Sequence, residues 1–204
     1  MLFDDTYKTI AAPSTGLFKD KGSKFLAFAY PIASDDNVKA LVLKLRSEHT
    51  KARHFCWALR LSPDRSLFRI QDDGEPSGTA GRPILNAMLS ADVTNLLIVV
   101  VRYFGGTLLG VPGLINAYKI AAVESIKEAS IIEKTINDIY QAEFDYLSIN
   151  DVMRLIKEEQ LIILEQNFDN TCSITLEIRK AQLNTVLGKL DKIDGVRVRY
   201  LRTI

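Results

Sequence analysis

Alternating hydrophobic and polar positions predict an α+β chain in which strands and helices follow one another closely. Residues 96–101 form an uninterrupted apolar run, which is typical of a central strand covered on both faces. The aromatic-rich run at 25–30 predicts an earlier strand that ends at Pro31. Apolar residues spaced three and four positions apart predict a helix around 38–45, with Ser34 as its N-cap.

The same pattern predicts one hairpin and two further helices in the first part of the chain. Residues 49–61 predict a helix exit that leads into a strand, and this strand should pair antiparallel with a second strand at 67–70 across a short turn. A short helix follows, with Thr79 or Ser77 as its N-cap. A longer helix begins at Pro112, since proline is well suited to the first helical turn.

The pattern restarts near residue 131 and then runs strand, helix, strand, strand, helix, strand. Alternation over 136–146 indicates a strand with one wet face, and the last helix stops at Gly195 before a closing strand. The order βαββαβ is the ferredoxin-like arrangement. We therefore predict two domains, residues 1–132 and residues 133–204, of which the second is ferredoxin-like.

Composition and charge narrow the classes of protein without selecting one. Hydrophobic residues make up 47% and charged residues 25% of the chain, which is ordinary for a globular protein. The net charge of +1 gives no compositional argument for nucleic acid, so only a local patch could bind it. Cys56 and Cys172 are too far apart for a Cys-rich zinc site. No apolar run is long enough to span a membrane and the first residues lack the features of a signal peptide, so we expect a cytoplasmic protein with no membrane partner.

Two glycine-rich, charged loops flank the central apolar run and form the strongest candidate for a ligand site. The second loop places Gly105 and Gly110 at almost the spacing of a phosphate-binding P-loop, but Val111 and Pro112 stand where that motif needs Lys and Ser or Thr. One hypothesis is a weaker anion site, because the following helix would point free N–H groups at the loop, with Arg102 as a clamp. The other is that the glycines only allow a tight turn and Arg102 pairs with an acid of the first loop.

The first loop carries Asp72, Asp73 and Glu75 close together. Such carboxylates are suitable ligands for Mg²⁺ or form an acid–base pair. Asp and Gly are also common turn formers, through hydrogen bonds from the backbone to the Asp side chain, and we favour this structural interpretation. The basic residues available as counter-charges are Lys24, Arg53, Arg82 and Arg102.

His49, His54 and Cys56 suggest two further hypotheses, neither of which we adopt. The two histidines have a suitable spacing for a metal ion, but a fourth ligand is missing nearby and the segment alternates like a strand. Cys56 could act as a nucleophile with His54 as its base, but the sequence shows no third group that would orient the pair. We therefore predict no metal, no cofactor and no catalytic residue.

Two long motifs carry a resemblance to a known family. Residues 72–81 read Asp-Asp-Gly-Glu-Pro-Ser-Gly-Thr-Ala-Gly, and residues 99–110 read Val-Val-Val-Arg-Tyr-Phe-Gly-Gly-Thr-Leu-Leu-Gly. Together with His54-x-Cys56-Trp57-Ala58, they resemble the Impact/YigZ family, and the resemblance covers essentially the whole chain. It implies a first domain of the ribosomal-protein type, with helices on one side of a sheet, and a second domain similar to domain V of the translocating elongation factor. Many relatives have Leu-Gly-Thr-Gly-Gly-Leu where this chain has Leu-Gly-Val-Pro-Gly-Leu at 109–114, which removes a hydroxyl and a glycine where an anion would bind.

The resemblance also implies a role in translation, since eukaryotic Impact proteins regulate translation by binding the ribosome-associated activator of an initiation-factor kinase. We therefore predict a non-enzymatic binding protein linked to translation, which contacts RNA, the ribosome or a translation-associated protein. Lys19 and Lys21 would add phosphate contacts. The alternative is a Mg²⁺-dependent enzyme, or a binder of a phosphate-bearing small molecule, that uses the acidic and glycine-rich loops. The candidate binding residues are Lys24, Asp72, Asp73, Glu75, Arg82, Arg102, Tyr103, Phe104, Gly105, Gly106, Gly110 and Tyr118.

Overall fold

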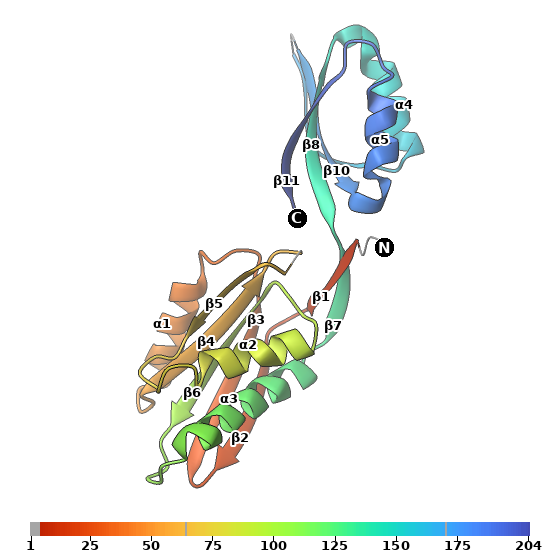
Figure 1. Ribbon diagram of the computed structural model, residues 1–204. Helices are drawn as coiled ribbons and strands as arrows, with labels where there is room; N and C mark the ends of the chain where they lie inside the picture. Colours follow the sequence, from red (N-terminus) through yellow and green to blue (C-terminus); the bar gives the residue numbers. More distant parts are fainter. Residues whose placement is uncertain (1–4, 64, 170) are drawn as a thin grey trace. The chain divides into compact units, whose positions relative to one another are not determined.

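The computed structural model describes residues 5–63, 65–169 and 171–204, which form two compact units (Figure 1). One unit is Tyr7–Lys134, and the other is Thr135–Ile204 with the short described stretch before Tyr7. The mixture of helices and sheets confirms the predicted α+β class. We retain the division of the chain after residue 132 as a proposal. Among the described residues, no helix is long and apolar enough to cross a membrane.

The first unit is built on a five-stranded sheet with the strand order β2-β3-β6-β4-β5. β6 occupies the centre, as its continuous apolar sequence predicts, and pairs antiparallel with both β3 and β4. The remaining neighbours, β2 with β3 and β4 with β5, are also antiparallel. The strands are β2 (Ser14–Asp20), β3 (Ser23–Pro31), β4 (His54–Leu61), β5 (Leu67–Gln71) and β6 (Leu96–Tyr103).

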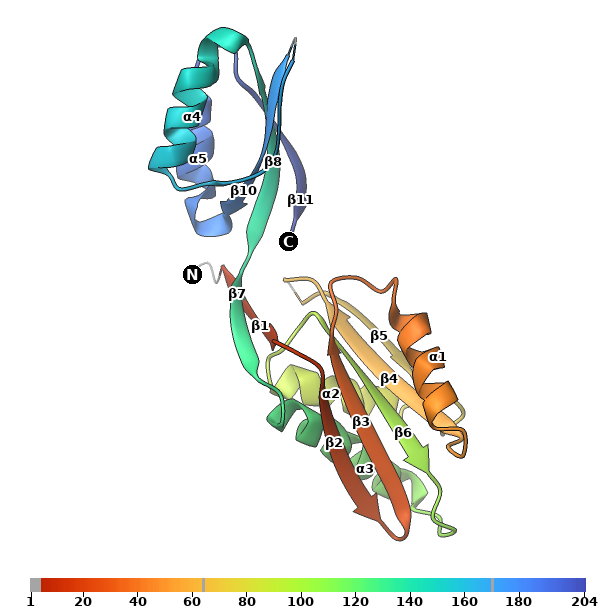
Figure 2. The same cartoon turned by 180° about the vertical axis from the view of Figure 1, so that it is seen from behind.

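Helices cover both faces of this sheet (Figures 1 and 2). Ile98 and Val100 of β6 belong to the core beneath α2 (Gly81–Ser90) and α3 (Gly110–Lys127). The alternate side chains of β6 point to the opposite face, where they pack against α1 (Val38–Glu48). The expectation of helices on one side only is therefore wrong for α1. That expectation disagreed with the all-apolar sequence of β6, because a strand with apolar side chains on both faces must be packed against other elements on both faces.

The predicted helix caps do not form. α1 begins at Val38, and Ser34 donates a hydrogen bond to the carboxylate of Asp36 instead of capping the helix. α2 begins at Gly81 without a side-chain cap, and Thr79 donates to the carbonyl of Pro76. In both places a local turn uses the hydroxyl that the sequence pattern assigned to a cap.

A separate two-stranded sheet joins β1 (Thr6–Ile10) to β7 (Ile131–Thr135). The sequence patterns indicated neither strand, and they also missed most of β2. Both strands of this small sheet are short, and their partners lie far apart along the chain. Local periodicity therefore gives no signal for the pairing.

The second unit has the element order βαββαβ and the sheet order β11-β8-β10-β9, as expected for a ferredoxin-like domain. All three strand pairs are antiparallel. Val152, Ile156, Val186 and Leu190 of the two helices pack on one face of the sheet. The elements are β8 (Asn137–Phe144), a 3₁₀ turn (Tyr146–Ser148), α4 (Ile149–Glu158), β9 (Ile162–Phe168), β10 (Cys172–Arg179), a second 3₁₀ turn (Lys180–Gln182), α5 (Leu183–Leu190) and β11 (Arg197–Thr203).

Candidate functional site: a basic cavity at the end of the central strand

The Asp72 carboxylate organises the acidic loop from within. It accepts hydrogen bonds from the backbone N–H groups of Gly78 at 2.8 Å, Ala80 at 3.1 Å and Gly81 at 2.8 Å. These contacts bind the loop to the first residue of α2, where the N–H groups lack helical partners. Asp72 therefore has the turn-forming role that its residue type favours.

Asp73 fastens the same loop to the sheet and to α1. Its carboxylate accepts hydrogen bonds from the backbone N–H of Phe55 and from the guanidinium of Arg46, both at 2.6 Å. Its carbonyl oxygen lies 2.9 Å from Nδ1 of His54. A carbonyl only accepts hydrogen bonds, so Nδ1 of His54 carries the proton and Nε2 is the second ring nitrogen.

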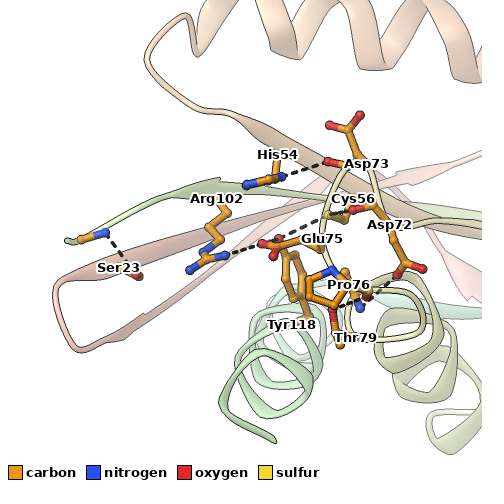
Figure 3. Close-up of polar contacts among 12 residues, drawn as sticks. Ser23, His54, Cys56, Asp72, Asp73, Glu75, Pro76, Thr79, Arg102 and Tyr118 are labelled. Carbon is orange, nitrogen blue, oxygen red and sulfur yellow. Dashed lines mark hydrogen bonds and ion pairs between the residues drawn. The ribbon is translucent and has the colours of Figure 1, made fainter. Parts of the chain in front are cut away.

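Glu75 forms a buried ion pair with Arg102 (Figure 3). The guanidinium lies 2.5 Å from Oε1 of Glu75, and the two side chains are only 6% and 4% exposed. The hydroxyl of Tyr118 donates to the same oxygen at 2.8 Å. Of the two hypotheses for Arg102, the structure thus shows pairing with an acid of the first loop, and it selects Glu75 as that acid.

The buried thiol and phenol behind this pair are unreactive groups. Sγ of Cys56 lies 2.9 Å from the carbonyl oxygen of Asp72 and 3.3 Å from the hydroxyl of Tyr118. Burial raises the pKa of Cys56 and of Tyr118 far above their ordinary values. Both groups are neutral at physiological pH, and a neutral thiol is a poor nucleophile. This agrees with the rejection of Cys56 as a nucleophile.

The three acids do not converge on a common point, which removes the geometric basis for a magnesium site. Figure 3 shows the carboxylates of Asp72, Asp73 and Glu75 pointing in different directions. Each already accepts the hydrogen bonds described above. Across the part of the chain that the structure describes, no group of three or more His, Cys, Asp or Glu residues is arranged to hold a metal ion.

The glycine loop after β6 is shaped by a close backbone contact. A Cβ at Gly105 would lie 1.9 Å from the carbonyl carbon of Gly22, so only glycine fits against the β2–β3 turn. The N–H of Gly105 donates to the hydroxyl of Ser23 at 3.2 Å. Gly106 and Gly110 have positive φ angles of 87° and 70°. α3 begins at Gly110, two residues before the predicted start at Pro112.

An open cavity of about 780 Å³ lies where β6 ends and β4 begins. His54 on β4 is the register partner of Arg102 on β6, which places the start of one strand beside the end of the other. The cavity therefore combines residues from both strands, from the segment before β4 and from the two loops. Its lining residues are Lys51, Arg53, His54, Gly74, Glu75, Arg102, Tyr103, Phe104 and Leu108.

The cavity has a positive lining and an aromatic wall. Lys51, Arg53 and Arg102 contribute positive charge, and the carboxylate of Glu75 is paired with Arg102. Phe104 is 52% exposed, and the guanidinium carbon of Arg102 lies 5.6 Å from the centre of its ring. The hydroxyl of Tyr103 is held 2.8 Å from Nδ1 of His49.

The structure brings only part of the predicted residue set to this cavity. Glu75, Arg102, Tyr103 and Phe104 line it. Sequence patterns assigned no binding role to Lys51, His54 or Leu108. A prediction that β4 pairs antiparallel with the central strand would have placed Lys51 and His54 at this cavity. The other candidates do not line it. Asp72, Asp73 and Tyr118 hold the loops through hydrogen bonds, and Gly105, Gly106 and Gly110 shape the glycine loop. Lys24 pairs in register with Tyr103, and the guanidinium of Arg82 lies over the ring of Phe68.

These features define a two-domain α+β protein whose first domain carries a basic, aromatic-lined cavity at the end of its central strand. A family model described as the Impact N-terminal domain matches residues 21–126. An IMPACT family member of Haemophilus influenzae is 33% identical over 180 residues, covering 87% of each chain. YigZ of Escherichia coli is 30% identical over 182 residues, covering 88% of this chain and 89% of that protein. A crystal structure titled as a hypothetical protein is 27% identical, with a TM-score of 0.75 and coverage of 97% and 98%. This chain belongs to the Impact family, which confirms the family prediction.

Proposed function

We propose that this protein is a cytoplasmic binding protein linked to translation, and that it contacts RNA through the cavity at the end of β6. The observation that carries the proposal is the cavity lining, in which Lys51, Arg53 and Arg102 lie beside the exposed ring of Phe104. Cationic side chains contact phosphates, and exposed aromatic rings stack on bases. The link to translation rests on membership of the Impact family.

The β2–β3 hairpin extends the positive surface beyond the cavity. Lys24 pairs in register with Tyr103, and Lys19 lies opposite Lys24 in the hairpin. Lys19 and Lys21 are exposed, and the turn between them and Lys24 contacts the loop at Gly105. These lysines would contact further phosphates of a ligand that extends beyond the cavity, which supports a chain-like ligand such as RNA.

The salt dependence of RNA binding tests this proposal. We expect the wild-type protein to bind RNA with an affinity that falls as salt rises. A Lys51→Ala/Arg53→Ala variant is expected to lower the slope of log affinity against log salt by about 1.4, which is two contacts at about 0.7 each on a single strand. A Lys44→Ala/Lys127→Ala variant removes two exposed charges elsewhere in the same unit and is expected to keep the wild-type slope. The proposal is contradicted if the wild-type protein does not bind RNA, or if its affinity for RNA does not change with salt concentration.

A phosphate-bearing small molecule is the second candidate ligand. The cavity volume of about 780 Å³ falls within the range of small-molecule sites, and its lining suits an anionic group with an attached ring. A panel of nucleotides in a thermal-shift assay, with and without Mg²⁺, tests it directly. A ligand that binds at millimolar concentration is expected to raise the melting temperature, and the absence of any shift counts against this candidate.

A further inference from the structure

Phe104 and Leu108 are large apolar side chains that the fold leaves uncovered at the cavity. Phe104 is 52% exposed and Leu108 is 82% exposed, and both line the cavity. Phe104 follows the last residue of β6, so the central strand holds its backbone. An exposed ring on a rigid element is suited to stacking, because little conformational entropy is lost when a base covers it.

Arg102 supports the inner side of this ring. Its guanidinium carbon lies 5.5 Å from the ring centre of Phe25 and 5.6 Å from that of Phe104, and its ion pair with Glu75 fixes its position. Nε of Arg102 is buried and has no hydrogen-bond partner among the described residues. The rigid guanidinium therefore forms a fixed inner support for the ring of Phe104 in the wall of the cavity.

The remaining cations lie where the phosphate of a stacked nucleotide would be. Lys51 and Arg53 are exposed and precede β4 on the cavity wall, whereas Phe104 follows β6. A nucleotide with its base on Phe104 therefore has cations of a second segment available for its phosphate. His54 offers Nε2 as a hydrogen-bond acceptor when its ring is neutral, because Nδ1 is engaged by the carbonyl of Asp73.

An aromatic wall inside a cavity favours unpaired over paired bases. In a duplex the faces of each base are covered by its neighbours, so Phe104 could stack only on an exposed end. A duplex would then contact the rim cations through its phosphates alone. A single strand would gain the base stack in addition, which changes affinity by about 5-fold to 150-fold per base.

We propose that the cavity accepts the base of an unpaired nucleotide on Phe104, so that the protein selects single-stranded over double-stranded RNA. This inference rests on the proposed RNA-binding function and names the class of RNA. Phe104 is the residue that sets the selectivity, Arg102 positions its ring, and Lys51 and Arg53 supply phosphate contacts that do not discriminate strongly between the two forms.

The test measures dissociation constants by fluorescence anisotropy for an unstructured RNA of about 12 nucleotides, alone and annealed to its complement. For the wild-type protein we expect a preference for the single strand of about tenfold or more. Phe104→Ala is expected to abolish most of this preference, while Phe104→Trp, which keeps a flat ring, is expected to retain it. Phe68→Ala is the matched control, because Phe68 is 48% exposed on β5 and does not line the cavity.

The outcomes separate this inference from the function on which it rests. Equal binding of both RNA forms by the wild-type protein overturns the single-strand selectivity and leaves RNA binding in place. An unchanged preference in Phe104→Ala overturns the role of the ring. Failure to bind either form overturns the proposed function and this inference together. Tryptophan fluorescence from Trp57 in β4 verifies that the unit is folded in Phe104→Ala and Phe68→Ala, and circular dichroism does so for Phe104→Trp, which has a second tryptophan.

Discussion

The buried pair of Glu75 and Arg102 gives a sharp prediction about stability. Replacing Glu75 by Ala leaves the Arg102 guanidinium, only 6% exposed, without its counter-charge. Loss of one partner of a buried ion pair costs about 3–5 kcal/mol of folding free energy. The Tyr118 hydroxyl also loses the acceptor that lies 2.8 Å away, but water from the adjoining cavity is able to replace it in part. We therefore expect Glu75→Ala to lower the free energy of unfolding by about 3–5 kcal/mol.

A double-mutant cycle isolates the pair from the other contacts of each residue. Arg102→Met keeps an unbranched side chain between the rings of Phe25 and Phe104, and on its own it leaves the Glu75 carboxylate buried without a cation. The double variant removes both charges. We expect it to be more stable than the sum of the two single losses indicates, because replacing a buried pair by apolar groups is often close to neutral.

Urea denaturation followed by Trp57 fluorescence provides the measurement. Trp57 is the single tryptophan of the chain and lies in β4, so its signal reports the unit that contains the ion pair and not the ferredoxin-like unit. Lys44→Ala, which breaks the exposed ion pair with Glu48, is the control and is expected to cost less than about 0.5 kcal/mol. A loss below about 1 kcal/mol for Glu75→Ala, with an unchanged urea dependence, refutes the argument.

Three further changes are expected to have distinct effects, each measured by the same denaturation assay. Gly105→Ala places a Cβ against the backbone of Gly22 and should cost about 1–3 kcal/mol; a neutral result contradicts the close contact. Asp72→Ala leaves three backbone N–H groups without their acceptor and should cost about 2–3 kcal/mol, with Asp72→Asn intermediate. Burial raises the pKa of Cys56 above the value of 9.0 expected for an unperturbed thiol, so above about pH 9 only the unfolded chain loses this proton. Stability should then fall by up to about 1.4 kcal/mol per pH unit from this group, and the slope should be smaller in Cys56→Ala.

The sequence predicted the elements whose signal is local. The continuous apolar run of β6 predicted a central strand covered on both faces, and the structure places it there. The order of the second domain followed from alternation in β8 and from helical spacing in α4 and α5. β1 and β7 gave no such signal, because each is stabilised by pairing with a strand more than a hundred residues away.

The candidate site was predictable in its parts but not in its pairings. The sequence left two hypotheses for Arg102: it clamps an anion, or it pairs with an acid of the first loop. It did not indicate which of the three acids would form that pair. The choice depends on the direction of each side chain: Asp72 bonds within its own loop, Asp73 bonds to the backbone of β4, and Glu75 alone reaches Arg102. Lys51 lines the cavity because the segment before β4 lies beside the end of β6. That position depends on the register of the two strands, which the sequence pattern did not specify.

The ion pair that holds these loops together also leaves the cavity lining with a net positive charge, because it neutralises the carboxylate of Glu75. Among the described residues, Glu75 is the one carboxylate in the lining, and its bonds to Arg102 and Tyr118 leave Lys51 and Arg53 without a competing acid from that part of the chain. The same pair holds the guanidinium behind Phe104. Stability and binding therefore depend on Arg102 in different ways. The double variant Glu75→Ala/Arg102→Met should recover much of the stability lost in the single variants. Its preference for single-stranded RNA should be weaker than that of the wild-type protein, because a flexible methionine replaces the guanidinium that the ion pair holds against the ring of Phe104. If the double variant binds single-stranded RNA as selectively as the wild-type protein, the positioning role of Arg102 is wrong and its contribution is to folding alone.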